Sequence, residues 1–155
     1  MERQLALAAQ LDVPVCLSAL VQLPMIAAAI GEGSGIGIVS TRSEESVRTD
    51  LEIAGIAVPR LLAILSIQDE TGYRQAFETR DGVLVTQAVQ DELEALVAQI
   101  CEQIDPVGAI LLDGSVLSPY AAGLRSRFRI NIFDVMTAVR LMVSATHQSK
   151  YVGIY

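Results

Sequence analysis

The stretch Ile104-Asp-Pro-Val-Gly-Ala-Ile-Leu-Leu-Asp-Gly-Ser-Val-Leu-Ser-Pro119 decides the fold of this chain. Its apolar centre, residues 108–112, has the length and character of a buried strand in a parallel sheet. Asp105-Pro106 ends the helix before it, and Ser118-Pro119 opens the helix after it, where proline has no N–H to lose. A buried strand between two helices indicates an α/β fold.

The same alternation extends in both directions along the chain. Strands are predicted at residues 13–16, 36–40, 60–67 and 130–133, and helices at residues 2–11, 19–30, 41–54, 86–103, 118 onwards and 134–146. The capping-box spacing from Thr41 to Glu44 opens the third of these helices, Gly55 ends it, and Asp134 caps the last one. Residues 69–80 are predicted to form a polar loop with one helical turn. Strands alternating with helices favour a doubly wound parallel sheet with right-handed crossovers, so the predicted class is α/β.

The composition indicates a protein with a sizeable aliphatic core. Hydrophobic residues make up 52% of the chain, whereas aromatic residues make up 5% and Trp is absent, so Ala, Val, Leu and Ile must fill the core. The net charge is −7, and no basic run is longer than the spaced Arg125, Arg127 and Arg129, which argues against nucleic-acid binding. Cys16 and Cys101 do not make a disulfide framework, so we expect a cytoplasmic protein.

A membrane-spanning segment is the alternative interpretation of the N-terminal part. Residues 13–31 are 19 positions without a charged side chain, which approaches the length that spans a bilayer. Pro14 and Pro24 interrupt this stretch, and no cluster of Lys or Arg flanks it. Spanning helices do contain proline and glycine, so the alternative stays open, but the pattern favours a chain without a membrane segment.

Candidate ligand-binding residues follow the predicted strands. Ligands of an open parallel sheet bind at the carboxyl ends of its strands, where loops and helix N-termini meet. Hydroxyl groups and a glycine lie at three such ends: Ser18 after the first strand, Ser40 and Thr41 after the second, and Gly114 and Ser115 after residue 112. Their hydroxyls and backbone N–H groups suit a carboxylate or a phosphate. The other interpretation is plain capping and turn chemistry, which accounts for most residues of this kind.

We expect no metal and no cofactor. The glycines at positions 31, 33, 35 and 37 precede a strand, whereas a dinucleotide-binding fingerprint follows its strand and opens a helix. His147 is the single histidine, without a second ligand at metal-binding spacing. Cys101 is expected to be a buried, inert thiol within its helix, and Cys16, at a strand end, leaves a reactive thiol open as an alternative.

The stretch from Gly108-Ala-Ile-Leu-Leu-Asp-Gly-Ser to Pro119-Tyr-Ala-Ala122, followed by Ile130-Asn-Ile-Phe-Asp134, resembles the second lobe of the aspartate/glutamate/hydantoin racemase superfamily. That family has an apolar strand, an acidic-Cys-Thr triplet, a Pro-Tyr helix start and a Pro-Val-Phe-Asp strand. Residues 13–24 are similar to the end of its first lobe, and residues 35–56 to the opening strand and helix of its second. The resemblance implies a remnant of the first lobe at 1–32, a second α/β lobe at 33–134, and a C-terminal helix and tail at 135–155 that packs back on the first lobe.

Members of this family racemise amino acids or related carboxylates without a cofactor, with the substrate between the two lobes. A cysteine from each lobe faces the substrate Cα, because inversion needs a base on one side and an acid on the other. In this chain Gly114 occupies the position of the second-lobe cysteine, and Ser115 occupies the hydroxyl position beside it. The first-lobe cysteine would lie upstream of the helix in which Met1 begins.

The resemblance therefore implies an isomerase-family protein that takes a small carboxylate or an amino acid and whose racemase activity is impaired. The alternative is a non-catalytic module that binds carboxylates or oligomerises, with a second copy or a partner filling an open sheet edge. We expect a homo-oligomer without nucleic-acid or membrane partners. Whether the chain is an active enzyme stays open at this point.

Overall fold

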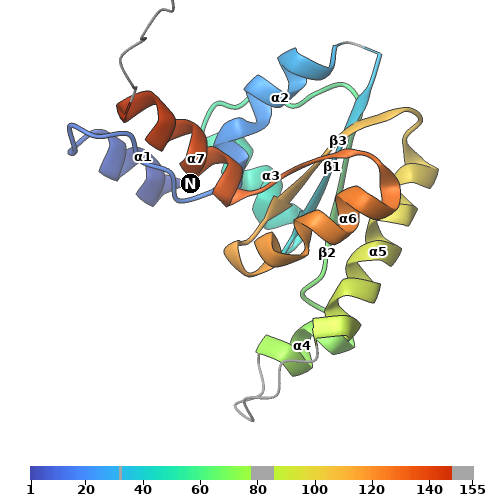
Figure 1. The fold of residues 1–155 in the computed structure, drawn as a ribbon. Helices are drawn as coiled ribbons and strands as arrows, with labels where there is room; N and C mark the ends of the chain where they lie inside the picture. The colour runs from blue at the N-terminus through green and yellow to red at the C-terminus, as the bar shows by residue number, and fades with distance from the viewer. Residues whose placement is uncertain (32, 78–85, 148–155) are drawn as a thin grey trace, which may run out of the picture.

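A four-stranded parallel sheet forms the centre of the molecule in a computed structural model, which describes residues 1–31, 33–77 and 86–147 (Figure 1). The strands are β1 (Gly35–Ser40), β2 (Leu62–Ser66), β3 (Val107–Asp113) and β4 (Asn131–Phe133), in the spatial order β2-β1-β3-β4. All three strand pairings are parallel. The predicted α/β class with a parallel sheet is therefore confirmed.

Helices surround this sheet and make its connections. They are α1 (Glu2–Ala8), the 3-10 helix η1 (Ala19–Gln22), α2 (Leu23–Ile30), α3 (Glu44–Ile53), α4 (Thr71–Phe77), α5 (Thr86–Gln103), the 3-10 helix η2 (Ser115–Tyr120), α6 (Ala121–Phe128) and α7 (Val135–Thr146). By chain order α3 joins β1 to β2, α4 and α5 join β2 to β3, and η2 with α6 joins β3 to β4. These connections give the alternation that the sequence predicts.

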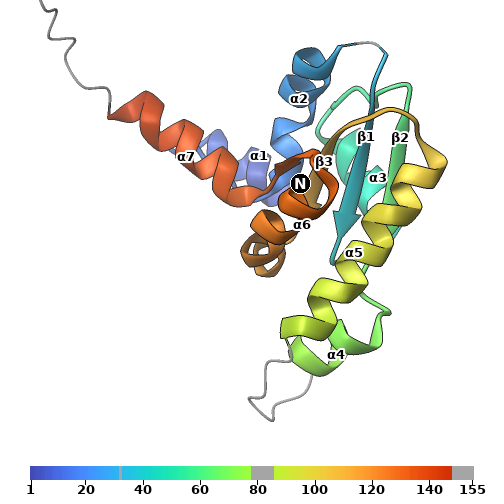
Figure 2. The same ribbon diagram turned by 45° about the vertical axis from the view of Figure 1, so that its right-hand side comes forward.

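Helices lie on both faces of the sheet (Figure 2), and a hydrophobic layer fills the space between the sheet and the helices on each face. Val39 and Ile110 belong to the layer that α5 and α6 cover, whereas Ile38 and Leu111 belong to the layer that η1, α2 and α3 cover. Successive residues of one strand thus serve opposite layers, as the alternation of a strand requires. A Cβ atom at Gly37 would lie 2.6 Å from side-chain carbons of α5 and β3, so glycine is what lets α5 approach β1.

The strand order creates a switch point between β1 and β3. From β1 the chain proceeds outward to β2 through α3 on one face, and from β3 it proceeds outward to β4 through α6 on the other face. Ser40 and Asp113, at the carboxyl ends of β1 and β3, lie side by side in the strand register. Because the two following loops diverge there, this is the place where open α/β sheets bind ligands.

The predicted strand at residues 13–16 is wrong. This segment joins no sheet, and its backbone is held by a side chain instead. The Nε2 atom of buried Gln4 donates to the Val15 carbonyl at 2.8 Å, and the Leu17 N–H donates to Gln4 Oε1 at 2.6 Å. Proline at position 14 also removes one backbone donor that a strand would need.

Two predicted helix starts are shifted. Ser43 caps α3, with its hydroxyl accepting from the Ser46 N–H, so the capping box counted from Thr41 is wrong. The helix expected to open at Ser118 begins earlier, at Ser115, as the 3-10 helix η2, with Pro119 inside it; the α-helical part follows from Ala121. Local spacing identified these helices, but several adjacent hydroxyl residues competed for the capping position.

Other boundaries agree closely with the prediction. Helix α5 spans the predicted residues 86–103, and Asp134 caps α7 in a capping box with Thr137. Helix α4 supplies the helical turn expected within residues 69–80, of which 78–80 lie outside the described residues. No helix in the described ranges is long and apolar enough to cross a membrane. The division of the chain at residues 32 and 134 stays a prediction.

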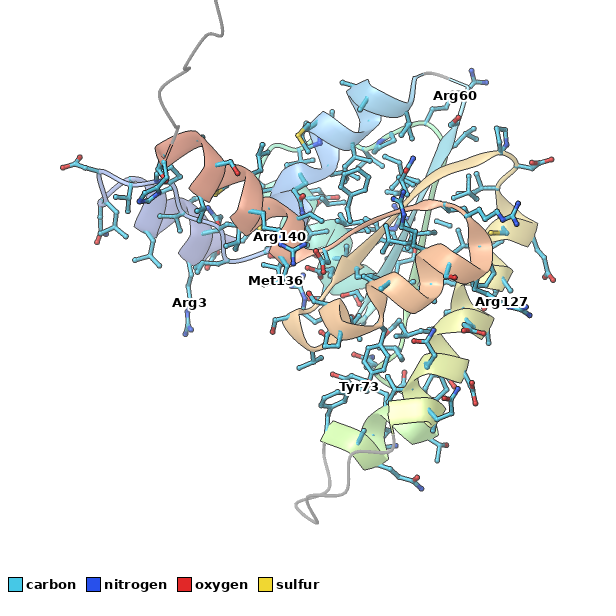
Figure 3. The ribbon with its side chains drawn as sticks, in the orientation of Figure 1. Arg3, Arg60, Tyr73, Arg127, Met136 and Arg140 are labelled. Atoms are coloured by element: carbon cyan, nitrogen blue, oxygen red, sulfur yellow. The ribbon has the colours of Figure 1, made fainter. Side chains whose placement is uncertain are left out.

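Helix α7 projects from the body of the molecule and buries little of its surface (Figure 2). Among the residues of α7, only Ala138 is buried, whereas Met136, Leu141 and Val143 are exposed. Figure 3 shows Met136 and Arg140 as side chains of this helix. At the N-terminal end of the chain, Leu5, Leu7, Leu11, Val13 and Leu17 are exposed as well. These two segments carry most of the large apolar side chains that the structure leaves uncovered.

Candidate functional site

A crevice of about 310 Å³ lies at the switch point, over the carboxyl ends of β1 and β3. The loop after β1 contributes Thr41 and Arg42, and the loop after β3 contributes Gly114 and Ser115. The segment before η1 adds Ser18, and α1 adds Arg3 and Gln4. The N-terminal segment therefore closes one side of a site whose floor is the sheet.

The floor of the crevice is the carboxylate of Asp113, which is only 5% exposed. Three groups donate hydrogen bonds to it: Ser40 Oγ to Oδ2 at 2.9 Å, Arg42 Nη2 to Oδ2 at 2.8 Å, and Ser18 Oγ to Oδ1 at 3.3 Å. A carboxylate removed from water needs such donors, because an unpaired buried charge is very costly. Ser40 Oγ also accepts from the Arg42 N–H and Ser18 Oγ from the Leu20 N–H, so the O–H proton of each serine is used in holding the floor.

Arg42 joins the floor to helix α3. Its Nη1 donates to Asp50 Oδ2 while its Nη2 donates to Asp113. Burial lowers the pKa of Arg42, but the hydrogen bonds to Asp113 and Asp50 outweigh burial, so the pKa lies above its ordinary value. Arg42 is therefore a fixed, permanently charged brace, and its charge is offset by two carboxylates.

Asp50 completes this cluster on α3. Its side chain is 15% exposed, and its Oδ1 accepts from the Met1 amine at 2.6 Å. Burial raises the pKa of Asp50, but the hydrogen bonds from the Met1 amine and from Arg42 outweigh burial and hold the pKa below its ordinary value. Asp50 is thus charged together with Arg42 throughout the neutral range.

Gly114 takes a backbone conformation that excludes a side chain. Its φ is +154°, in the range that residues with a Cβ rarely adopt. A Cβ atom there would lie 2.6 Å from Thr41 Cγ2 and 3.0 Å from Thr41 Oγ1. The space that a cysteine would need at this position is therefore filled by Thr41.

Two hydroxyls of the crevice are left for a ligand. Thr41 Oγ1 and Ser115 Oγ make no hydrogen bond to any residue in the ranges that the structure describes, and both residues line the crevice. They come from opposite loops, one after β1 and one after β3. A ligand in the crevice would meet one hydroxyl on each side.

Neither cysteine lines the crevice. Burial raises the pKa of Cys16, although hydrogen bonding with the Ser18 backbone acts in the other direction. Burial also raises the pKa of Cys101, which lies in α5. Both are protonated thiols at neutral pH, so the reactive-thiol alternative for Cys16 gains no support.

The described part of the chain contains no cluster of three or more His, Cys, Asp or Glu side chains that could hold a metal ion. His147 is exposed at the end of α7, where a ring nitrogen lies 2.9 Å from Thr146 Oγ1. It is far along the helix from the crevice-lining residue Val135.

The structure brings most of the sequence-predicted residues together. Ser18, Thr41, Gly114 and Ser115 line the crevice, whereas Ser40 is fully buried beneath it and holds Asp113. Arg42 and Asp50 are not among the residues predicted from the sequence, and Asp113 is named there without a role. A charged residue within two positions of the end of a buried strand is a signal for Arg42 and Asp113, whereas Asp50, mid-way along α3, gives none.

Comparison with known proteins gives one line of support for the fold. No family model matches the sequence, and no curated protein is significantly similar to it. A solved structure of allantoin racemase from Pseudomonas fluorescens superposes with a TM-score of 0.54 at 14% sequence identity. The match covers 88% of this chain but only 60% of the racemase chain, so this chain spans about three fifths of that protein. The chain is therefore similar in fold to a racemase.

Proposed function

We propose that this chain is a racemase-like isomerase-family protein that binds a small amino acid, carboxylate or ureide in the crevice and is impaired in racemisation. The observation that carries the proposal is a crevice at the switch point with a braced arginine, two unused hydroxyls and no thiol. The similarity in fold to an allantoin racemase supports the family and suggests allantoin as one probe.

The charges of the crevice favour a ligand with at most one net negative charge. Arg42 is matched by Asp50 and Asp113, so its positive charge is not free to attract a dianion. Arg3 lines the crevice from α1 and makes no ion pair within the described ranges; its side chain extends from that helix in Figure 3. We infer that Arg3 meets a single carboxylate or carbonyl, while Thr41 and Ser115 bind the polar groups beside it.

Impaired racemisation follows from the acid–base groups that the crevice offers. Inversion at Cα needs one proton-transfer group on each side of the substrate. The carboxylates of Asp50 and Asp113 are held by Arg42, and a serine or threonine hydroxyl without a neighbouring base removes a Cα proton very poorly. Both thiols lie outside the crevice.

The direct test combines binding with exchange. Isothermal titration with alanine, aspartate, glutamate, malonate and allantoin should show binding of at least one compound, which Thr41→Val weakens by about tenfold for one lost hydrogen bond. Thr49→Val, the same substitution at an exposed threonine of α3 outside the crevice, is the matched control. Proton NMR of the bound compound in D₂O should show no loss of the α-hydrogen signal. Exchange at an enzymatic rate would overturn the impairment, and binding of none of the five would reject the ligand site.

A second candidate function is self-association through α1 and α7. The uncovered apolar side chains of these segments form the specific observation that favours it, because soluble monomers rarely leave such groups exposed together. The occupant that fits is a second copy of this chain: α7 carries exposed Arg140, whereas Glu2 and Asp12 flank the apolar residues of the N-terminal segment.

Sedimentation of the wild-type chain and of Leu141→Glu tests this candidate. The wild type should be a dimer at micromolar concentration and Leu141→Glu a monomer, whereas Val58→Glu should remain dimeric. Val58 is the matched control because it is 49% exposed, close to the 53% of Leu141, but lies between α3 and β2. A wild-type monomer at every concentration would reject a second copy as the occupant, whether or not another protein or a vesicle binds there.

A further inference from the structure

A second hollow, of about 420 Å³, lies on the molecule between the end of α6 and the start of β4. Arg125, Ser126, Arg129 and Asn131 contribute polar side chains to its lining. Asn131 is the first residue of β4, so the hollow adjoins the amino end of this parallel sheet, whereas the crevice lies at the carboxyl ends. The two cavities share no lining residue.

The arginines of this hollow have no acidic partner among the described residues. Arg125 and Arg129 are four positions apart, which places both on one side of the helix end. Neither makes an ion pair with any residue in the part of the chain that the structure describes. Arg127, which Figure 3 labels, does not line the hollow. Its Nε atom lies 3.7 Å from a carboxylate oxygen of Glu94 on α5. On a chain with a net charge of −7, two unpaired cations on one hollow form a local positive patch.

The backbone at Arg129 is a second, independent observation. Its φ of 57° and ψ of 26° are left-handed, and its N–H donates to the Arg125 carbonyl at 2.9 Å in the manner of a helix-ending cap. Glycine is the usual residue at this position, because a Cβ disfavours the left-handed conformation. An arginine is held here against its local preference, and residues held in this way concentrate at binding sites.

We propose that this hollow binds a small phosphate-bearing anion. Guanidinium groups match phosphate oxygens with paired N–H donors, and two of them, with the Ser126 hydroxyl beside them, suit a doubly charged group. The Asn131 amide donates one N–H to the Gly108 carbonyl at 3.3 Å and has another for a ligand. The volume lies within the usual range for small-molecule pockets. No further basic residue lines the hollow, so the site suits one phosphate group or two rather than a nucleic-acid strand.

Titration of the full chain with inorganic pyrophosphate, followed by ¹H–¹⁵N NMR at constant ionic strength, tests the proposal. Pyrophosphate should shift the amide signals of residues 122–131, and chloride at equal ionic strength should not. Arg125→Gln and Arg129→Gln should each weaken binding by about tenfold, since each removes charge-assisted hydrogen bonds. Arg127→Gln removes the same charge from the same helix outside the hollow and should change the affinity by less than about twofold.

Arg129→Gly separates charge from backbone conformation. It keeps the left-handed turn without strain, so the fold should remain intact while pyrophosphate affinity falls as it does in Arg129→Gln. Equal loss of binding in the Arg127 control would indicate a diffuse surface attraction and overturn the site, as would the absence of any shift at millimolar pyrophosphate. Thr41→Val, in the crevice, should leave pyrophosphate binding unchanged, which keeps this test independent of the proposed function.

Discussion

The crevice and the α6–β4 hollow both contain arginine, but they use it in opposite ways. In the crevice Arg42 forms ion pairs with Asp50 and Asp113, so its positive charge is already neutralised by two carboxylates of the same chain. In the hollow Arg125 and Arg129 are exposed and bind no carboxylate of the residues that the structure describes. The number of arginines that line a cavity therefore does not predict the charge of its ligand. An arginine attracts an anionic ligand only where carboxylates of the same chain do not already neutralise it.

The largest expected effect on stability comes from removing Asp113, the common acceptor at the floor of the crevice. Asp113→Ala leaves Arg42 and two inward hydroxyls without their common acceptor, so we expect a loss of about 2–4 kcal/mol in the free energy of unfolding. Urea denaturation measures this loss. Glu94→Ala removes the carboxylate near Arg127 and should cost less than about 1 kcal/mol, because the two groups are 3.7 Å apart and Arg127 is 70% exposed. Equal losses in the two variants would show that the interactions of Asp113 contribute no more to the stability of the fold than the pair of Arg127 with Glu94.

The next effect concerns the glycine beside the brace. Gly114→Ala should destabilise the fold by about 1–3 kcal/mol, because the new Cβ meets both a disfavoured φ and the Thr41 side chain. Thr41→Ala should relieve part of this loss in a double-mutant cycle, since it removes the two atoms nearest the Cβ. Gly114→Cys should behave like Gly114→Ala and should gain no racemisation. A stable Gly114→Cys variant that exchanges α-protons would contradict the assigned geometry.

A smaller effect is expected at Asp50, the second carboxylate that is bonded to Arg42. The pKa of Asp50 is below its ordinary value of 3.8, so its interactions stabilise the fold above that pH, and this stability is lost as the pH falls through the lowered pKa. Asp50→Asn should therefore reduce the stability at pH 6 and flatten its decline between pH 5 and pH 2. Glu44→Gln, which removes an exposed pair with Arg48, is the control and should leave the pH profile nearly unchanged. If the stability of Asp50→Asn declines between pH 5 and pH 2 as steeply as that of the wild type, protonation of Asp50 does not contribute to the loss of stability in acid.

The smallest expected effect is at Arg129 in the hollow. Unlike the variants above, a substitution there should raise the free energy of unfolding. Arg129→Gly should stabilise the chain by a few tenths to about 1 kcal/mol, because relief of the left-handed strain exceeds the added entropy of the unfolded chain. Thermal unfolding measures this gain, with Arg127→Gly as the control that should destabilise α6 from within. Destabilisation by Arg129→Gly would mean that the side chain packs more favourably than the backbone strain costs.

Much of the fold could be predicted from local pattern. The apolar runs of β1 and β3 are buried on both faces, and a run of this kind has few other stable environments. Helix α5 was identified to the residue because its apolar stripe is long and regular. The segment around Val15 was misjudged, because its partner is the distant Gln4 side chain and no local pattern reveals such a contact.

The site was only partly predictable for a related physical reason. Residue type and position after a strand identified Thr41, Gly114 and Ser115 as crevice residues. The role of Asp50 depends on α3 bringing its carboxylate back to Arg42, and that return depends on packing across the sheet. The sequence also could not show that the left-handed strain sits at Arg129, because helix ends are set by tertiary context.

The register of Ser40 with Asp113 has a consequence for how this protein could change its ligand. Neighbouring strands are held about 4.8 Å apart by their backbone hydrogen bonds, so the base of the crevice cannot widen without breaking the sheet. The side chains of Thr41 and Ser115 stand above that base and bear no structural hydrogen bond within the described chain. Selectivity can therefore be altered at these two positions while the scaffold stays intact, which makes them the natural starting points for redesign.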